Sequence, residues 1–275
     1  MIRERTFAVD GDDIALLDRS GDALPLIFIH GNSVSKECFG GLFDAPVLAG
    51  NRLIAFDLPG CGASSDARNP QGTYTLPGLG RLLVSIIKAL ELDRYVLVGW
   101  SLGGHLAIQS LLNGAQPEGI VLTGTPPCGP DPTEIAATFL PVAGSEMMSM
   151  ENPTDEQRAA FARLVCAPSE PSADMLMAVE RSDGRLRKRL FEHIFATPDM
   201  EPQRTTIARW TQPFALIQGR DEPFFDPAAL DHLRWGRLWR GGTQWIEGAG
   251  HAPFITKPGG YAGLLKAFAD EVTRS

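Results

Sequence analysis

The sequence predicts an α/β fold with a mostly parallel central sheet flanked by helices and a helical cap inserted into it. Several segments are continuous runs rich in valine, isoleucine and leucine, the pattern of strands that are buried on both faces. Segments with apolar residues at helical spacing lie between these runs. This alternation is typical of a parallel sheet covered by helices on both sides. With 275 residues, 44% of them hydrophobic, the chain can bury a sizeable core.

The predicted elements follow one another in a regular order. Residues 1–19 predict a β-hairpin, because two strand-like segments, RTFAVD and DIALLDR, flank the turn-forming sequence GDD. The strand-like segments that follow are LPLIFIHG, NRLIAFDLPG, YVLVGW, GIVLTGTPP, PFALIQG and TQWIEGAGH. The clearest helical segments of this part are LGRLLVSIIKALEL, LGGHLAIQSLL and YAGLLKAFADEV. Functional sites in such sheets form in the loops at the carboxyl ends of the strands.

Residues 127–205 interrupt this alternation. They hold helical patterns and many prolines, but no strand-like segment. We interpret them as a helical cap between the sixth and seventh strands, so that residues 1–126 and 206–275 form the core. A separate helical domain is the alternative, and it is disfavoured because strand-like sequence resumes at Phe214.

Composition and charge exclude several classes of function. The formal charge of −8 argues against a nucleic-acid partner, which would favour a basic surface. No apolar segment is long enough to span a membrane, and the first residues lack the apolar region of a secretory signal. The four scattered cysteines lack metal-ligand spacing and predict reduced thiols in a cytoplasmic protein. We therefore expect no metal or other cofactor, while the oligomeric state stays open.

A candidate nucleophile lies in the sequence Gly99-Trp100-Ser101-Leu102-Gly103. It has the pattern G-x-S-x-G between a predicted strand and a predicted helix, which is the context that the motif requires. The turn is tight, so the residues two positions before and after the serine must be small. Because the helix dipole also favours developing negative charge at this end, the motif predicts a catalytic serine.

Such a serine needs a base and an acid. Of the histidines well beyond Ser101, His251 is the best candidate, because it follows the last strand-like segment in the loop GAGHAPF. The acid is expected after the strand PFALIQG, where Asp221 and Glu222 stand side by side. The chemistry of the two residues does not choose between them.

A tetrahedral intermediate also needs donors for its oxyanion. The backbone N–H of Leu102, directly after the nucleophile, is expected to supply one of them. The second is assigned to the N–H of Asn32, in the loop HGNS after the strand LPLIFI.

Together these residues resemble the α/β-hydrolase superfamily over nearly the whole chain. The segments HGN, DLPGCGAS, GWSLGGH and GHAPF occur in the family's order. In that family the acid commonly stands three residues after the glycine at the strand end. This resemblance favours Glu222 over Asp221, although glutamate departs from the commoner aspartate. Asp57 resembles the family's structural turn and is given no catalytic role.

A narrower resemblance connects the chain with the N-acyl-homoserine lactone hydrolases of this fold. The segments that carry it are HGNS, DLPGCGASSDA, GWSLGGH, TGTPP, RSDGRLRK, GRDEPF and GHAPF. It implies opening of a lactone ring, and hence quenching of a bacterial signal, without a metal ion. Metal-dependent lactonases carry histidine clusters, whereas the five histidines here are scattered.

The expected substrate is a small ester or lactone with an acyl chain. Ser33, Trp100 and Phe224 are predicted to contact it. The cap offers apolar side chains for an acyl pocket, although most of them are expected to pack the cap itself: Phe139, Leu140, Met147, Met148, Met150, Phe161, Leu164, Met175, Leu176 and Met177. The basic segment Arg185, Arg187, Lys188 and Arg189 is predicted to be a solvated helix face.

Other functions are compatible with the same residues. General carboxylesterases, carbon–carbon bond hydrolases and perhydrolases share this architecture and triad, because a fold does not determine a reaction. A small-molecule receptor that uses a hydrolase pocket without turnover is a non-enzymatic alternative. Labelling of Ser101 by a phosphonate probe would separate an enzyme from such a receptor.

Overall fold

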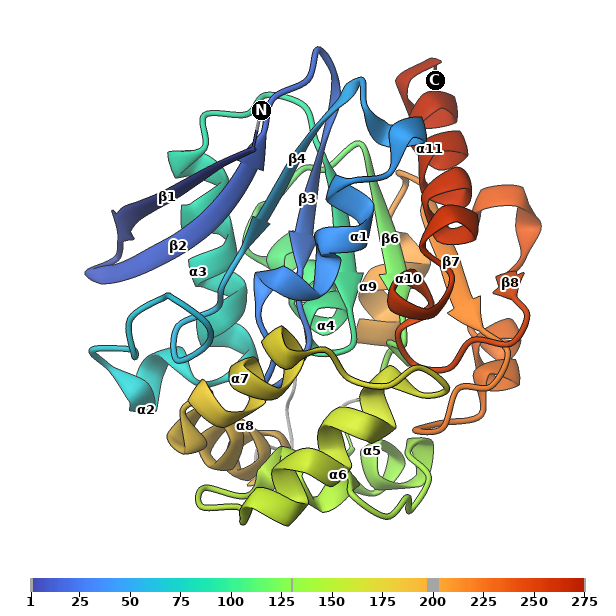
Figure 1. The fold of residues 1–275 in the computed structure, drawn as a ribbon. Helices are drawn as coiled ribbons and strands as arrows, with labels where there is room; N and C mark the ends of the chain where they lie inside the picture. The colour runs from blue at the N-terminus through green and yellow to red at the C-terminus, as the bar shows by residue number, and fades with distance from the viewer. Residues whose placement is uncertain (1, 130, 197–202, 275) are drawn as a thin grey trace.

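The computed structural model describes residues 2–129, 131–196 and 203–274. An eight-stranded sheet forms its centre, in the order β1-β2-β4-β3-β5-β6-β7-β8 (Figure 1). The strands are β1 (Ile2–Val9), β2 (Asp12–Arg19), β3 (Ala23–Ile29), β4 (Asn51–Phe56), β5 (Val96–Trp100), β6 (Gly119–Thr123), β7 (Phe214–Gly219) and β8 (Gln244–Ile246). Each corresponds to a strand-like segment of the sequence, so the predicted fold class is confirmed.

Burial explains why the central strands read as continuous apolar sequence. The strands β3 to β8 pair in parallel, and every residue of β5, β6 and β7 is buried. The hairpin of β1 and β2 is antiparallel and joins the sheet through β2 and β4. β1 lies at the sheet edge and is mostly exposed, which accounts for its charged sequence.

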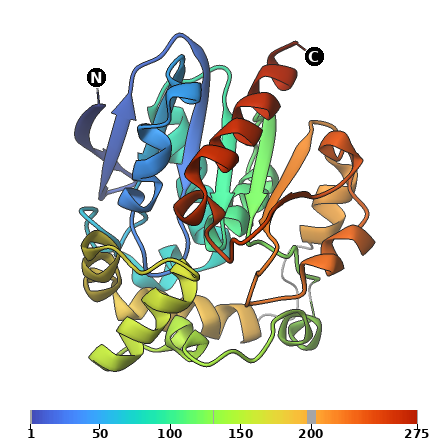
Figure 2. The ribbon, with the colours of Figure 1, turned by 45° about the vertical axis from the view of Figure 1, so that its right-hand side comes forward.

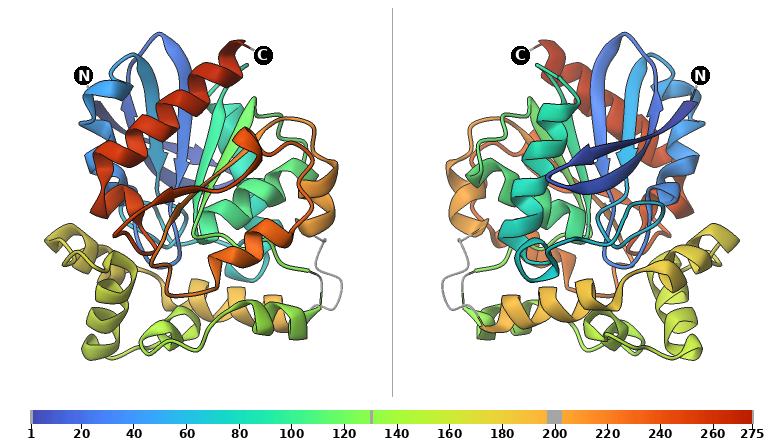
Figure 3. Two further views of the ribbon diagram at one scale, coloured as in Figure 1. Left: turned by 90° about the vertical axis from the view of Figure 1, so that its right-hand side faces the viewer. Right: turned by 90° about the vertical axis from the view of Figure 1, so that its left-hand side faces the viewer.

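Helices cover both faces of the sheet (Figures 2 and 3). One face carries α3 (Leu76–Ala89), α4 (Leu102–Leu112) and α9 (Gln203–Arg209), and α4 packs against both of the others. The opposite face carries α1 (Gly40–Phe43), α10 (Pro253–Thr256) and α11 (Pro258–Arg274), which contact one another. The three predicted helices of the core are confirmed: α4 has the predicted bounds, α3 begins and ends three residues earlier than its predicted segment, and α11 is longer at both ends.

The cap lies across the carboxyl ends of the strands (Figure 1). It contains α5 (Pro132–Thr138), η3 (Ser145–Ser149), α6 (Asp155–Cys166), α7 (Ala173–Arg181) and α8 (Gly184–Ala196). Its predicted end at residue 205 falls inside α9, a helix that packs on α4 of the core. Residues 130 and 197–202 of the predicted cap lie outside the described residues.

Several short elements have no counterpart in the sequence prediction. They are η1 (Lys36–Phe39), η2 (Pro46–Leu48), α2 (Pro70–Thr73), η4 (Pro227–His232) and η5 (Trp239–Gly241), together with α1, α9 and α10. Each spans only one or two turns, too few for an apolar period to be recognised.

The four cysteines are free thiols, as predicted, and all but Cys38 are buried. Within the described part of the chain, no helix has both the length and the apolar character needed to cross a bilayer. The cytoplasmic location stays a prediction.

Replacing Gly103 with alanine is expected to destabilise the fold by about 3 kcal/mol, because the added methyl overpacks a rigid site. A Cβ there would lie 2.0 Å from the carbonyl oxygen of Ile29, and backbone atoms cannot rotate away. Denaturant unfolding of Gly103→Ala measures the loss. The control is Gly263→Ala in α11, where no atom lies within 4 Å of the new methyl. Equal stability of the two variants would contradict this account of the turn.

Candidate active site

Ser101 occupies a strained turn between β5 and α4. Its backbone dihedrals are φ 54° and ψ −120°, a region that residues with side chains rarely adopt. The turn is possible because Gly99 and Gly104 touch, and a Cβ on Gly99 would lie 2.5 Å from the Cα of Gly104. The Ser101 N–H donates to the carbonyl of Thr123 at 2.8 Å, and the Thr125 hydroxyl donates to the Ser101 carbonyl at 2.9 Å. These contacts hold the serine at the carboxyl edge of the sheet.

His251 and Glu222 lie side by side at the carboxyl edge of the sheet. Glu222 is in the loop after β7, and His251 is in the loop after β8. The Nδ1 atom of His251 is 2.8 Å from one carboxylate oxygen of Glu222 and 2.9 Å from the other. Both side chains are buried, and the Phe224 N–H donates a further hydrogen bond to Glu222 at 3.0 Å. Asp221, the alternative acid, is exposed. The tertiary structure therefore brings Glu222, and not Asp221, to the imidazole.

Aromatic rings pack around the imidazole. The Phe224 ring centroid is 4.4 Å from that of His251, and the Trp100 centroid is 5.5 Å away. The indole N–H of Trp100 donates to the His251 carbonyl at 2.9 Å. Gly124 completes this packing, because a Cβ there would lie 2.6 Å from the imidazole Cε1. Trp100, predicted to contact substrate, is instead buried beneath the histidine loop, and it lines only a recess of about 10 Å³ beside Ser101.

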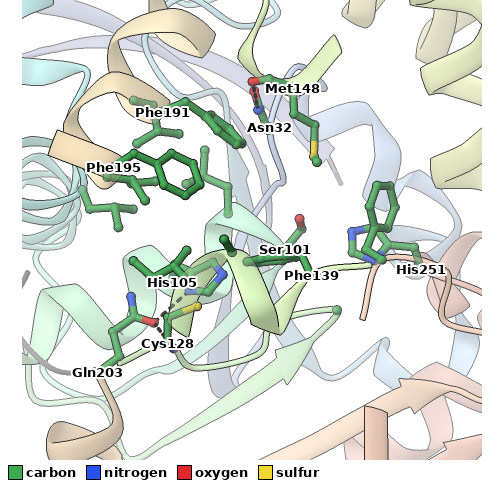
Figure 4. Close-up of a pocket in the computed structure, with 18 residues that line it drawn as sticks. Asn32, Ser101, His105, Cys128, Phe139, Met148, Phe191, Phe195, Gln203 and His251 are labelled. Atoms are coloured by element: carbon green, nitrogen blue, oxygen red, sulfur yellow. Dashed lines mark hydrogen bonds between the residues drawn. The ribbon is translucent and has the colours of Figure 1, made fainter. Parts of the chain in front are cut away.

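Ser101 and His251 line the same cavity, and Figure 4 shows them next to each other at its base. Within the described residues no hydrogen bond joins the serine hydroxyl to the imidazole. In proteins without substrate, such catalytic hydrogen bonds are often long and shorten when the complex forms.

The two predicted oxyanion donors lie in the same cavity as the Ser101 hydroxyl. The backbone N–H groups of Asn32 and Leu102 donate to no acceptor within residues 2–129, 131–196 and 203–274. Leu102 is the first residue of α4, so its N–H has no partner within the helix. Both residues line the cavity that contains Ser101. Two unpaired donors thus lie on the same cavity wall as the serine.

The side chain of Asn32 has a different partner, the cap. Its amide nitrogen donates to the Met148 carbonyl at 2.9 Å, and its oxygen accepts from the Ser33 hydroxyl at 3.0 Å. Ser33 was expected to contact substrate, but it is fully buried and lines neither the cavity nor the recess. Its hydroxyl donates to the Asn32 side chain and accepts from Arg187, so Ser33 stabilises the loop that carries Asn32 on the side away from the cavity.

The prediction of a solvated basic face on α8 is wrong for Arg187. It is only 2% exposed, because its guanidinium turns inward and bonds the carbonyls of Met150, Glu151 and Ser182. It also donates to the hydroxyls of Ser182 and Ser33. The neighbouring Lys188 follows the prediction, with an exposed ion pair to Glu151. Arg187 therefore fastens the cap to the loop that carries Asn32.

The cavity has a volume of about 270 Å³ and a mostly apolar wall. The cap contributes Phe139, Met148, Leu190, Phe191, Ile194 and Phe195 to this wall. Phe224 also lines it, as predicted for a substrate contact. Other apolar cap residues lie away from this wall: Met147 and Met175 are buried in the core cluster, whereas Leu176 and Met177 are exposed.

Three polar residues of the cavity were missed at the sequence level. They are His105, Cys128 and Gln203, which form a connected group on the side of Ser101 away from His251 (Figure 4). His105 could have been found from its spacing, because it stands four residues after Ser101 and so shares its helix face. Gln203 carried no such signal.

A sequence model described as the Alpha/beta hydrolase family matches residues 26–264. The chain belongs to the α/β hydrolase family. Its curated relatives in the family include a pimeloyl-[acyl-carrier protein] methyl ester esterase of Nitrosomonas europaea. It is 26% identical, and the match covers 88% of this chain and 94% of the relative. The biotin biosynthesis bifunctional protein BioHC of Teredinibacter turnerae is also 26% identical over 88% of this chain, which spans 44% of that longer protein.

Solved structures of this family are also similar to the chain. The N-acyl homoserine lactonase AidH, complexed with N-butanoyl homoserine, superposes with a TM-score of 0.94 and 31% identity. The match covers 100% of this chain and 98% of AidH. The esterase RhEst1 from Rhodococcus superposes with a TM-score of 0.75 at 22% identity, over 98% of this chain and 99% of the esterase, which shows the shared fold. The α/β hydrolases that resemble this chain thus include esterases and a lactonase.

Proposed function

We propose that this α/β hydrolase uses Ser101 to open the lactone ring of N-acyl-homoserine lactones. The observation that carries the proposal is the apolar cavity of about 270 Å³ that is lined by Ser101, His251, Asn32 and Leu102, the last two with N–H groups that have no acceptor among the described residues. The similarity to AidH, at 31% identity over the whole chain, supports the choice of substrate.

Acylation begins with attack of the Ser101 hydroxyl oxygen on the lactone carbonyl carbon. His251 accepts the hydroxyl proton on Nε2, since its Nδ1 faces the Glu222 carboxylate at 2.8 Å. Glu222 holds the ring orientation and stabilises the imidazolium that forms. The N–H groups of Asn32 and Leu102 donate to the oxyanion, and each such donor contributes about 3–4 kcal/mol of transition-state stabilisation.

Collapse of the tetrahedral intermediate breaks the ring C–O bond. The released alkoxide takes the proton from His251 and becomes the hydroxyl of the homoserine portion, which stays attached through the acyl-enzyme. A water molecule then attacks this ester, with His251 as general base, and Ser101 leaves. The product is the open N-acyl-homoserine, and the reaction consumes one water. It uses no metal or other cofactor.

The shape and polarity of the cavity suit the acyl portion of this substrate. Its cap-side wall is built by aromatic and aliphatic groups such as Phe139, Met148 and Phe191, which gain contacts with methylene groups. Met148 is also tethered through its carbonyl to Asn32, so the cap wall and the oxyanion loop are held together. The acyl chain and the reacting carbonyl would therefore be positioned by connected parts of the protein.

A panel of acyl-homoserine lactones tests the proposal. We expect the purified protein to release acid from lactones with medium acyl chains, and mass spectrometry to find a product heavier than the lactone by one water. Simple aryl and methyl esters of matched chain length are assayed beside them. Absence of ring opening together with efficient ester cleavage would replace the lactonase proposal by the second candidate.

That second candidate is a carboxylic ester hydrolase with the same triad. The observation in its favour is the similarity to pimeloyl-[acyl-carrier protein] methyl ester esterases, at 26% identity over most of both chains. The attack by Ser101 would be unchanged, but the leaving alcohol would separate from the acyl group. Product mass distinguishes the two, because a lactone yields one product and an ester yields two.

A further inference from the structure

The loop that carries Asn32 has no regular secondary structure of its own. Residues 30–35 lie between β3 and η1 and belong to no helix or strand. Ser33 adopts a φ of 59°, in the left-handed region that residues with side chains rarely occupy. The loop also passes directly against the nucleophile, since a Cβ on Gly31 would lie 3.2 Å from the Ser101 Cβ. The position of the Asn32 N–H therefore depends on the contacts that this loop makes with other segments.

A chain of hydrogen bonds connects the loop to the cap at two points. Arg187 donates from Nη1 to the Ser33 hydroxyl at 3.3 Å. That hydroxyl donates to the Asn32 side-chain oxygen at 3.0 Å, and the Asn32 amide nitrogen donates to the Met148 carbonyl at 2.9 Å (Figure 4). An arginine can only donate and a carbonyl can only accept, so the direction of every bond in the chain is determined. Bonds in such a chain polarise and strengthen one another.

The guanidinium of Arg187 closes this chain into a ring. Its Nε donates to the Met150 carbonyl at 2.6 Å, two residues after Met148. Its Nη2 donates to the Glu151 carbonyl at 3.3 Å. Because Nη1 bonds the loop, all three nitrogens are bound, and the planar shape of the group fixes their directions. Both polar atoms of the Asn32 side chain are therefore held by the same part of the cap.

The burial of Arg187 calls for a role other than packing. The residue is 2% exposed, and within the described part of the chain all of its hydrogen bonds go to neutral oxygens. Arginine keeps its charge inside proteins, and an apolar side chain of similar volume is often as stable as a buried charge or more so. Arg187 and Ser33 line neither the cavity nor the recess, so they do not contact the substrate.

We infer that Arg187 is a positioning residue that fixes the Asn32 N–H as an oxyanion donor. It acts through the Ser33 hydroxyl and not through contact with the substrate. A donor has to lie about 2.7–3.1 Å from the oxyanion, so a small shift of the loop weakens it. This inference rests on the proposed function for the attack by Ser101, and it applies to lactones and esters alike.

Ser33→Ala and Arg187→Met test the inference through kcat. Loss of a whole oxyanion donor lowers kcat by about 10²- to 10³-fold, so we expect a loss of about tenfold for Ser33→Ala and about 10²-fold for Arg187→Met. KM should stay within about twofold of the wild type, because an interaction made only in the transition state is weakened. The control is Lys188→Met, an exposed neighbour on α8, which should keep the wild-type kcat.

Three further measurements separate positioning from damage to the fold. A trifluoromethyl ketone forms an adduct with Ser101 that places an oxyanion between the donors, so its Ki should rise by the factor by which kcat falls. The double variant of Ser33→Ala and Arg187→Met should lose no more kcat than Arg187→Met alone, because both changes break one chain. Arg187→Lys keeps the charge but not the planar fork, so it should not restore kcat.

Several outcomes would overturn the inference. They are a wild-type kcat in Ser33→Ala, losses that multiply in the double variant, or a wild-type kcat in Arg187→Lys. A Ki that stays constant while kcat falls would also exclude an effect on the oxyanion donor. If Arg187→Met does not fold, Ser33→Ala decides alone, because it leaves the guanidinium with its carbonyl partners.

Failure of the proposed function gives a different result. If lactones are not opened but esters are cleaved, kcat for methyl octanoate decides the inference. If neither class is turned over, NMR measures the exchange of the Asn32 amide proton with solvent. Exchange that is about tenfold faster in Ser33→Ala, but not in Lys188→Met, supports the positioning role. Equal exchange rates in the wild type and Ser33→Ala overturn it.

Discussion

The Ser101→Ala protein is expected to lose hydrolysis of esters and lactones by about 10⁵- to 10⁶-fold in kcat, the size of effect seen when a triad serine is removed. Without the hydroxyl no acyl-enzyme can form, and only the oxyanion donors remain to assist water. The measurement is release of p-nitrophenol from a short aryl ester, together with acid release from a lactone.

The fold of this variant should be unaffected. Alanine loses only a hydroxyl that makes no hydrogen bond within the described part of the chain, so thermal unfolding should resemble that of the wild type. Ser20→Ala, at an exposed position, is the matched control. Full activity of pure Ser101→Ala protein would refute the mechanism and would favour the receptor alternative.

Glu222→Gln is expected to reduce kcat by about 10⁴-fold, as is found when the acid of a serine triad becomes an amide. An amide can present an N–H to the imidazole, which favours the wrong tautomer and removes the charge that stabilises the imidazolium. Glu222 is well placed for this role, because its buried carboxylate lies 2.8 Å from His251 Nδ1. Steady-state kinetics on one ester and one lactone measure the loss.

Asp221→Asn is the matched control, since it makes the same chemical change at the neighbouring residue. Asp221 is exposed, so we expect kcat to stay within about twofold of the wild type, as for most surface changes. If Asp221→Asn loses activity and Glu222→Gln remains active, our assignment of the acid is wrong. Equal and large losses of kcat in both variants would mean that the substitutions disturb the loop, and that neither carboxylate alone accounts for the loss.

The fold was predictable from the sequence because its strands and long helices carry strong periodic signals. Segments such as GIVLT and FALIQG are apolar without interruption since both of their faces are covered. Short elements such as α10 and η2 carry no period, and they became visible only in the structure. The predicted cap boundary at residue 205 falls inside α9 for a related reason, because nothing in the sequence of α9 indicates that it packs on α4.

Individual side chains of the site were harder to predict than its backbone positions. Trp100 and Ser33 stand in motifs beside the candidate catalytic residues, but their side chains turn away from the cavity and support His251 and Asn32. Arg187 belongs to a basic segment that was predicted to be solvated, yet it is buried, and its guanidinium donates hydrogen bonds to backbone carbonyls of two cap segments. Side-chain direction and partners depend on neighbours that are distant in sequence, which a motif does not contain.

The sequence by itself determined the layered sheet, the glycine-lined turn around Ser101 and a short set of candidate bases and acids. These follow from local rules, namely burial of apolar strands and the space needed at a tight turn. Only the tertiary structure decided that Glu222 and not Asp221 faces His251, that Asn32 tethers the cap, and that His105 and Gln203 share the cavity. Those contacts join residues between 29 and 116 positions apart, so they exist only after the chain has folded.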